Sequence, residues 1–155
     1  MPIHLSPQQH QTLRTGDRYS EQMTGLEQFA ADRDAHPADL IEILHSEFSS
    51  LAMRDRAAYN PALDLQQLQV LASETDADWY PALVGNPNCD ADLIRQLWNS
   101  RYIRSYIFRV IRHPNTPDDI LVDIARGYDW IAPHAAEEAR DRLPEHLQCL
   151  VKLTA

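Results

Sequence analysis

The chain of 155 residues is poor in glycine and cysteine and has no long apolar run. Its four glycines are isolated from one another, which excludes a glycine-rich phosphate loop. The two cysteines, Cys89 and Cys149, are far apart, which excludes a disulfide framework and a zinc site of the Cys-x-x-Cys type. No stretch approaches the roughly 18 apolar residues of a membrane span. Alternating apolar and polar runs long enough for strands are absent too.

Basic residues are also scarce. There are 23 acidic and 14 basic residues, and the net charge is −9; Lys152 is the only lysine, and the other basic residues are arginines. This charge repels nucleic acid and anionic membranes and attracts a basic protein partner. Residues 1–13 lack the cationic start and apolar run of a signal peptide. We therefore expect a cytoplasmic protein with a single domain, 1–155.

A repeat is present. Segments starting at Asn60 (NPALDLQQLQVLA), Asn86 (NPNCDADLIRQLW) and His113 (HPNTPDDILVDIA) align without a gap. They place Pro61, Pro87 and Pro114 in one column, and two further columns hold only leucine and isoleucine. Prolines fall at 37, 61, 87, 114 and 144, so the intervals are 24, 26, 27 and 30 residues. Periods of this size are typical of repeat proteins built from stacked units.

Each unit contains the signals of a short amphipathic helix. In the third copy we expect Thr116 to be the N-cap, Pro117 to occupy the first helical turn, and Asp118 and Asp119 to interact with the positive helix end. A second apolar segment follows in every unit. The pattern predicts an all-α fold, a short right-handed α-solenoid of stacked helical pairs. Residues 1–35 are expected to form N-terminal capping helices, and 36–155 about four to five helical repeats.

The pattern Asn-Pro-x-(Thr/Cys)-(Pro/Asp), followed by Leu or Ile at helical spacing and by Ala, resembles the leucine-rich repeat variant family. The resemblance covers about 36–150 and is strongest at 86–98 and 113–125. It implies helical pairs in a right-handed superhelix related to HEAT repeats, with protein binding as the commonest use. Some family members carry a cysteine-rich Fe-S segment, which this chain lacks, so we expect no cofactor.

An arginine-rich segment is the first candidate contact surface. On a helical wheel, four arginines fall on one face, with Phe108 among them and Tyr102 at the border. Three interpretations remain open: pairing with the acidic turns at 73–78 and 118–123, recognition of an acidic protein, and contact with nucleic acid, as in HEAT-like DNA glycosylases. The net charge of −9 opposes contact with nucleic acid. The four arginines are Arg101, Arg104, Arg109 and Arg112, and Arg95 is a fifth arginine of the same segment, which runs from Leu93 to Pro117.

Aromatic residues are concentrated between 79 and 130. Trp98 shares a column with Ala72 and Ala125 and is expected to fill a gap between repeats. Trp79 and Trp130 each follow Asp in a turn-like segment. With Tyr80, they complete the predicted partner surface.

Seven histidines raise the question of a metal site. They are scattered along the sequence, and the His146–Cys149 pair has helical spacing but supplies only two ligands, so we expect no metal. No nucleophile motif is present, and capping or solvation explains the paired carboxylates Asp118–Asp119 and Glu137–Glu138. We expect no catalytic residues and no enzyme activity.

The sequence thus predicts a protein-binding scaffold whose partner and oligomeric state it does not identify. The charge of −9 and the single domain raise a more specific hypothesis, an immunity or inhibitor protein that neutralises a basic toxin or nuclease. A HEAT-like nucleic-acid-binding protein is the third hypothesis.

Overall fold

The computed structural model describes residues 1–16, 20–74, 77–100, 103–127 and 132–152. The regular elements among these residues are helices, apart from an isolated bridge between Ile3 and Ala35. The predicted all-α class is confirmed. The elements are α1 (Pro7–Thr15), α2 (Ser20–Ala31), α3 (Pro37–His45), α4 (Leu51–Tyr59), α5 (Leu65–Leu71), η1 (Tyr80–Gly85), α6 (Ala91–Trp98), η2 (Ile103–Tyr106), α7 (Ile107–Arg112), α8 (Asp118–Gly127), α9 (Pro133–Arg142) and α10 (Glu145–Lys152).

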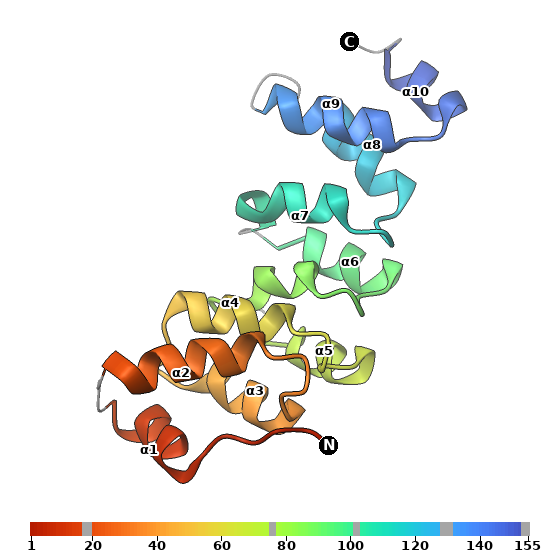
Figure 1. The fold of residues 1–155 in the computed structure, drawn as a ribbon. Coiled ribbons are helices and arrows are strands. Elements are labelled where there is room, and N and C mark those ends of the chain that lie inside the picture. Colours follow the sequence, from red (N-terminus) through yellow and green to blue (C-terminus); the bar gives the residue numbers. More distant parts are fainter. Residues whose placement is uncertain (17–19, 75–76, 101–102, 128–131, 153–155) are drawn as a thin grey trace.

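The elements follow one another in space in the order of the chain, and the two termini lie at opposite ends (Figure 1). Contacts run from α2 to α4, from α4 to η1, from η1 to α7 and from α7 to α9, while α3 packs on α4 and α8 on α9. The core is formed by the columns that the sequence alignment predicts. Their members are at most 2% exposed: Leu68, Ile94, Leu121, Leu71, Leu97 and Ile124.

Side-chain caps begin several of these short helices. Ser6 and Gln9 form a reciprocal capping box at α1, and Asp64 and Gln67 form one at α5. Asp90 caps α6 by accepting a hydrogen bond from the backbone N–H of Leu93 at 2.8 Å. Caps of this kind satisfy backbone donors that the first helical turn leaves unpaired. Each helix therefore has a defined start, but helices this short need packing to be stable.

The third copy differs from the expected capping pattern. The expected N-cap role of Thr116 is wrong, because its hydroxyl is buried and donates a hydrogen bond to the Val110 carbonyl. Pro117 occupies the column of the capping residues Asp64 and Asp90, and α8 begins after it. Cys89, in the column of Thr116, donates from Sγ to the Leu83 carbonyl at 3.1 Å. Burial raises the pKa of this thiol to about 12. In these two copies the column therefore supplies a buried donor to the preceding helix, whereas the first copy has Leu63 at this position.

The second segments of two units are shorter and tighter than expected. The segment after Trp79 forms the 3-10 helix η1, and the arginine-rich segment divides into η2 and α7 at Tyr106, whose φ of −113° and ψ of 13° depart from α geometry. Arg104 and Arg109 therefore do not lie on one continuous α-helix, and the single basic face drawn from the helical wheel is wrong.

The Asn-Pro columns end the second helix of a unit and start a turn. Asn60, Asn86 and His113 are the C-cap residues of α4, η1 and α7, with ψ between 126° and 129°. A following proline pushes its predecessor into this extended region and cannot continue the helix. In each turn the carbonyl of the C-cap residue accepts an N–H bond from the residue three positions later. The aligned prolines, Pro61, Pro87 and Pro114, thus stop one helix and open the turn to the next.

The same three side chains form a buried ladder, called here the Asn-Pro ladder: Asn60, Asn86 and His113. The Asn86 amide donates to the carbonyls of Ala58 and Asn60, both at 2.8 Å. His113 Nε2 lies 2.9 Å from the Asn86 carbonyl, and Asn60 donates to Ala30 and Asp32. Each ladder residue is at most 5% exposed. The ladder therefore links consecutive units through hydrogen bonds that are buried away from water.

His113 acts in this ladder as a substitute for asparagine. Its Nδ1 accepts the backbone N–H of Asn115 at 3.2 Å, as Asn86 Oδ1 accepts that of Asn88 at 3.0 Å. These two contacts require the neutral tautomer with the proton on Nε2. Burial lowers the pKa of His113, and the nearby Arg142 guanidinium lowers it further, while the bond to Asn86 opposes the shift.

This lowered pKa predicts a pH dependence of stability. In acid the unfolded chain takes up a proton at position 113 before the folded chain does, so the free energy of unfolding falls as pH drops below about 6.5. The variant His113→Asn retains the ladder bonds without the titration. We expect wild type to lose stability relative to this variant between pH 7.5 and 5, measured by urea unfolding. Parallel pH profiles of the two proteins would contradict the assignment.

Candidate binding groove

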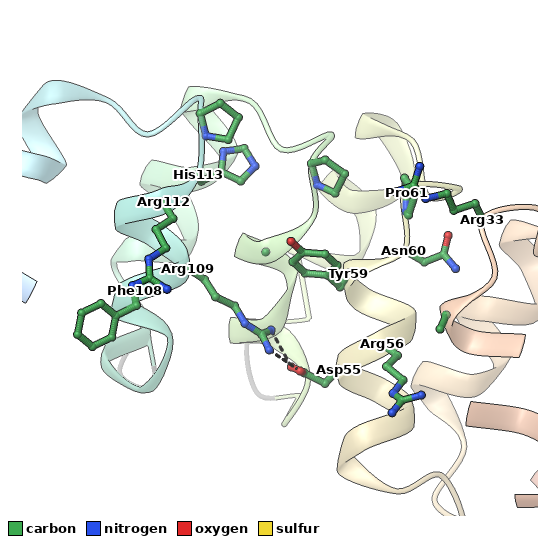
Figure 2. A pocket seen from close by; sticks show the side chains of 14 residues that line it. Arg33, Asp55, Arg56, Tyr59, Asn60, Pro61, Phe108, Arg109, Arg112 and His113 are labelled. Atoms are coloured by element: carbon green, nitrogen blue, oxygen red, sulfur yellow. Dashed lines mark hydrogen bonds and ion pairs between the residues drawn. The ribbon is translucent and has the colours of Figure 1, made fainter. Parts of the chain in front are cut away.

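A groove of about 990 Å³ crosses the C-terminal ends of the second helices, and its wall includes the three prolines of the turns (Figure 2). It runs from the end of α2 past α4 and η1 to α7, so it spans several units. The lining residues are Ala31, Arg33, Asp55, Arg56, Tyr59, Asn60, Pro61, Gly85, Pro87, Phe108, Arg109, Arg112, His113 and Pro114.

The floor of the groove depends on a close approach at Gly85. A Cβ atom at this position would lie 2.5 Å from Cδ2 of Tyr59 and 3.3 Å from Cδ of Arg109. Tyr59 therefore lies over η1, between α4 and α7, as Figure 2 shows. Because the ring is 51% exposed, it offers an aromatic surface to a ligand.

Arg109 spans the groove from α7 to Asp55 of α4 (Figure 2). Its two terminal nitrogens donate to the two carboxylate oxygens at 3.0 and 2.6 Å, a bidentate pair. The guanidinium carbon lies 4.9 Å from the ring centroid of Tyr106 and 5.7 Å from that of Tyr59. The hydrogen bonds that Arg109 donates to Asp55 raise the pKa of Arg109. Burial raises the pKa of Tyr106, and the Asp55 carboxylate adds to the shift. The pair thus holds α4 and α7 at a fixed separation.

Arg112 lies one turn further along α7 and pairs outside the groove. It donates to both carboxylate oxygens of Glu138 on α9, at 2.7 and 3.1 Å, which lowers the pKa of Glu138. Its guanidinium carbon is 5.4 Å from the ring centroid of Phe108, which is 40% exposed. A cation beside an exposed ring is a contact geometry used in recognition.

The opposite wall adds two more cations. Arg33 and Arg56 are exposed, and Arg56 Nη2 lies 3.8 Å from the nearest Glu27 oxygen, which is long for a hydrogen bond. The lining thus holds four guanidinium groups and one carboxylate, Asp55, on a chain whose net charge is −9. From outside the lining, Glu138 pairs with Arg112, and Glu27 lies near Arg56. Clustered charge of one sign, partly shielded from solvent, strengthens the local field.

The predicted partner surface is only partly present here. Phe108, Arg109 and Arg112 line the groove, whereas Arg104 is exposed on η2 outside the lining. The prediction is wrong for Trp79 and Tyr80, which are 3% and 2% exposed and belong to the core. Tyr80 belongs to η1, which packs against α4, α6 and α7, and Trp79, directly before η1, makes an edge contact with the ring of His45. Three predicted residues lie outside the described part of the chain: Arg101, Tyr102 and Trp130.

The pairing interpretation of the arginines holds in part. Arg95 donates to Asp119 at 3.1 and 3.2 Å, which ties α6 to the acidic first turn of α8. The acidic turn at 73–78 is engaged instead by Arg54, which pairs with Asp78. Arg109 and Arg112 pair with Asp55 and Glu138, which belong to neither turn. Pairing across units is therefore common, but it does not follow the predicted partners.

Comparisons with protein families, curated proteins and solved structures found no match to this chain. None of the helices in the described ranges is long and apolar enough to cross a bilayer.

Sequence reasoning missed the wall formed by Arg33, Asp55, Arg56 and Tyr59. One signal could have found part of it. Arg56 and Arg109 each lie four residues before the aligned Asn60 or His113. Tyr59 and Arg112 each lie one residue before it. Equivalent positions in a repeat face the same side when the units stack. The arginine at the fourth position before the turn was thus repeated in two copies.

Proposed function

We propose that this chain is a non-catalytic scaffold built from leucine-rich-repeat-variant-like helical repeats, which binds another protein through the groove. The helical pairs would stack as a short right-handed α-solenoid. Support comes from the Asn-Pro ladder, which repeats the same contacts from unit to unit, and from the end-to-end order of the elements. Surfaces that span several stacked units commonly serve as extended binding sites.

The observation that carries this proposal is the charge of the groove. Four guanidinium groups and the aromatic rings of Tyr59 and Phe108 face a space of about 990 Å³ that includes only one carboxylate in its lining. Arginine and tyrosine are residue types enriched in binding hot spots. A partner would insert an extended segment rich in Asp and Glu, whose carboxylates would bind Arg33 and Arg56 and compete with Asp55 for Arg109.

The net charge favours a second candidate function. At −9, the protein would attract a basic toxin or nuclease and act as its cytoplasmic inhibitor, with the acidic residues outside the groove as contacts. A lysate pull-down washed at rising salt tests this version. If the inhibitor hypothesis holds, the pull-down should capture a basic protein whose binding weakens as the salt concentration rises. The same protein should still be captured when arginines of the groove are replaced by glutamate.

Fluorescence anisotropy with a labelled ten-residue polyglutamate peptide tests the groove. We expect the double variant Arg33→Glu/Arg56→Glu to bind this peptide at least tenfold more weakly than wild type, because two attractive charges become repulsive. Both side chains are exposed, so folding should be preserved, which circular dichroism checks.

The matched control is Arg126→Glu, which reverses an exposed arginine of α8 outside the groove. It should change affinity less than threefold at 150 mM salt, where distant surface charges are screened. Equal losses in the control and groove variants would show general charge attraction and contradict a groove site. Tighter binding of a labelled dT10 oligonucleotide than of polyglutamate would assign the groove to nucleic acid instead.

A further inference from the structure

Three of the four arginines that line the groove, in the described part of the chain, lie beside a carboxylate of the chain itself. Two of these pairs are bidentate and the third is longer, at 3.8 Å: Arg109–Asp55, Arg112–Glu138 and Arg56–Glu27. A ligand that binds one of these arginines directly must therefore replace a carboxylate that is already there. The proposed function includes such an exchange, in which an acidic segment competes with Asp55 for Arg109.

Arg109 is well placed for the exchange. Its guanidinium carbon lies 4.9 Å from the ring centroid of Tyr106 and 5.7 Å from that of Tyr59, so the two rings support the cation when Asp55 turns away. The Arg109 and Asp55 side chains are 37% and 26% exposed, so a ligand can reach the pair. Figure 2 shows the guanidinium between α7 and α4, with Asp55 on its far side from the α7 backbone.

A carboxylate ligand gains little from this exchange. Asp55 already supplies two oxygens to the two terminal nitrogens of Arg109, at 3.0 and 2.6 Å. A glutamate of a partner would form the same two bonds, and its long side chain would lose rotamer freedom in doing so. Efficient replacement of Asp55 therefore needs an acceptor that is stronger than a carboxylate.

A phosphate monoester is an acceptor of this kind. At pH 7 it carries a charge of about −1.5 to −2 and three acceptor oxygens. Two of its oxygens match the planar fork of a guanidinium, as those of a carboxylate do, but with more charge. The third oxygen remains for another donor. A phosphoryl group can therefore displace Asp55 where a carboxylate competes on equal terms.

We propose that the groove recognises a phosphorylated side chain within an extended acidic segment of a partner protein. The phosphoryl group binds the two terminal nitrogens of Arg109 in place of Asp55. The flanking residues of the segment lie along the exposed ring of Tyr59 and the prolines of the turns, where Arg33 and Arg56 attract their carboxylates. This inference rests on the proposed function and adds the chemical group that the segment carries. Phosphorylation of the partner would then control its binding.

Fluorescence anisotropy with two labelled peptides tests the inference. Their sequences are the same apart from one central position, which is glutamate or phosphoserine between flanking glutamates. We expect wild type to bind the phosphoserine peptide at least tenfold more tightly, because the second charge of the phosphate acts directly at a guanidinium. A preference below threefold would overturn the inference, while saturable binding of both peptides would leave the acidic-segment function standing. Binding of neither peptide would contradict both proposals.

Two conservative variants separate recognition by the guanidinium fork from general charge attraction. Arg109→Lys keeps the positive charge but loses the two parallel donors, so its preference for phosphoserine over glutamate should fall below threefold. The matched control is Arg126→Lys, the same replacement at an exposed arginine of α8 outside the groove, and it should keep the full preference. Circular dichroism checks that both variants fold. A full preference in folded Arg109→Lys would overturn the assignment of the phosphoryl group to Arg109.

Discussion

Replacing Asn86 by alanine is expected to lower the free energy of unfolding by about 3–4 kcal/mol. The amide of Asn86 makes two buried hydrogen bonds to Ala58 and Asn60 and accepts a third from Asn88. Alanine removes all three, and each backbone group left without a partner costs about 1–3 kcal/mol, although the Asn60 carbonyl keeps its bond to Leu63. The side chain is 0% exposed, so water does not replace these bonds without opening the interface between units.

Urea unfolding followed by circular dichroism measures this loss as a lower midpoint at unchanged slope. The matched control is Asn99→Ala at the end of α6, where the amide makes an exposed bond to Arg95 at 3.1 Å, and it should cost less than about 0.5 kcal/mol. Asn86→His should cost less than Asn86→Ala, because His113 makes both kinds of ladder bond. A cost below about 1 kcal/mol for Asn86→Ala would show that the ladder does not hold the units together.

Replacing Asp55 by asparagine is expected to strengthen binding of the polyglutamate peptide about tenfold. The Asp55 carboxylate occupies both terminal nitrogens of Arg109, and it repels an acidic ligand. A unit charge about 5 Å from a ligand carboxylate contributes about 3 kcal/mol at an effective dielectric constant of 20, and salt screening reduces it toward the 1.4 kcal/mol of a tenfold change. Asparagine keeps the shape and removes the charge.

The opposite variant, Arg109→Gln, should weaken peptide binding about tenfold, because the ligand loses its central cation. Both variants break the same ion pair, whose side chains are 37% and 26% exposed, so both should lose a similar small stability of about 1 kcal/mol. Opposite changes in affinity with equal changes in stability are the signature of a recognition site. Affinity changes of the same sign would show that the pair only positions α4 and α7.

The sequence predicted more of the fold than of the groove. The leucine and isoleucine columns and the turns at the aligned prolines were visible because each depends on residues close in sequence. The N-cap of α8 was misassigned because Thr116 found a buried acceptor, the Val110 carbonyl, whose position depends on the preceding helix. Trp79 was expected at the surface because its neighbours are turn residues, yet the packing of η1 buries it.

The sequence by itself determined the helical class and the repeated Asn-Pro turns that end the second helices, since these follow from local backbone preferences and apolar periodicity. Only the tertiary structure decided which charges meet. It placed Asp55 against Arg109, 54 residues apart, and His4 against Asp39, 35 residues apart. Such pairs depend on which segments pack together, which no periodicity encodes. The groove likewise depends on contacts between segments that are distant in the sequence.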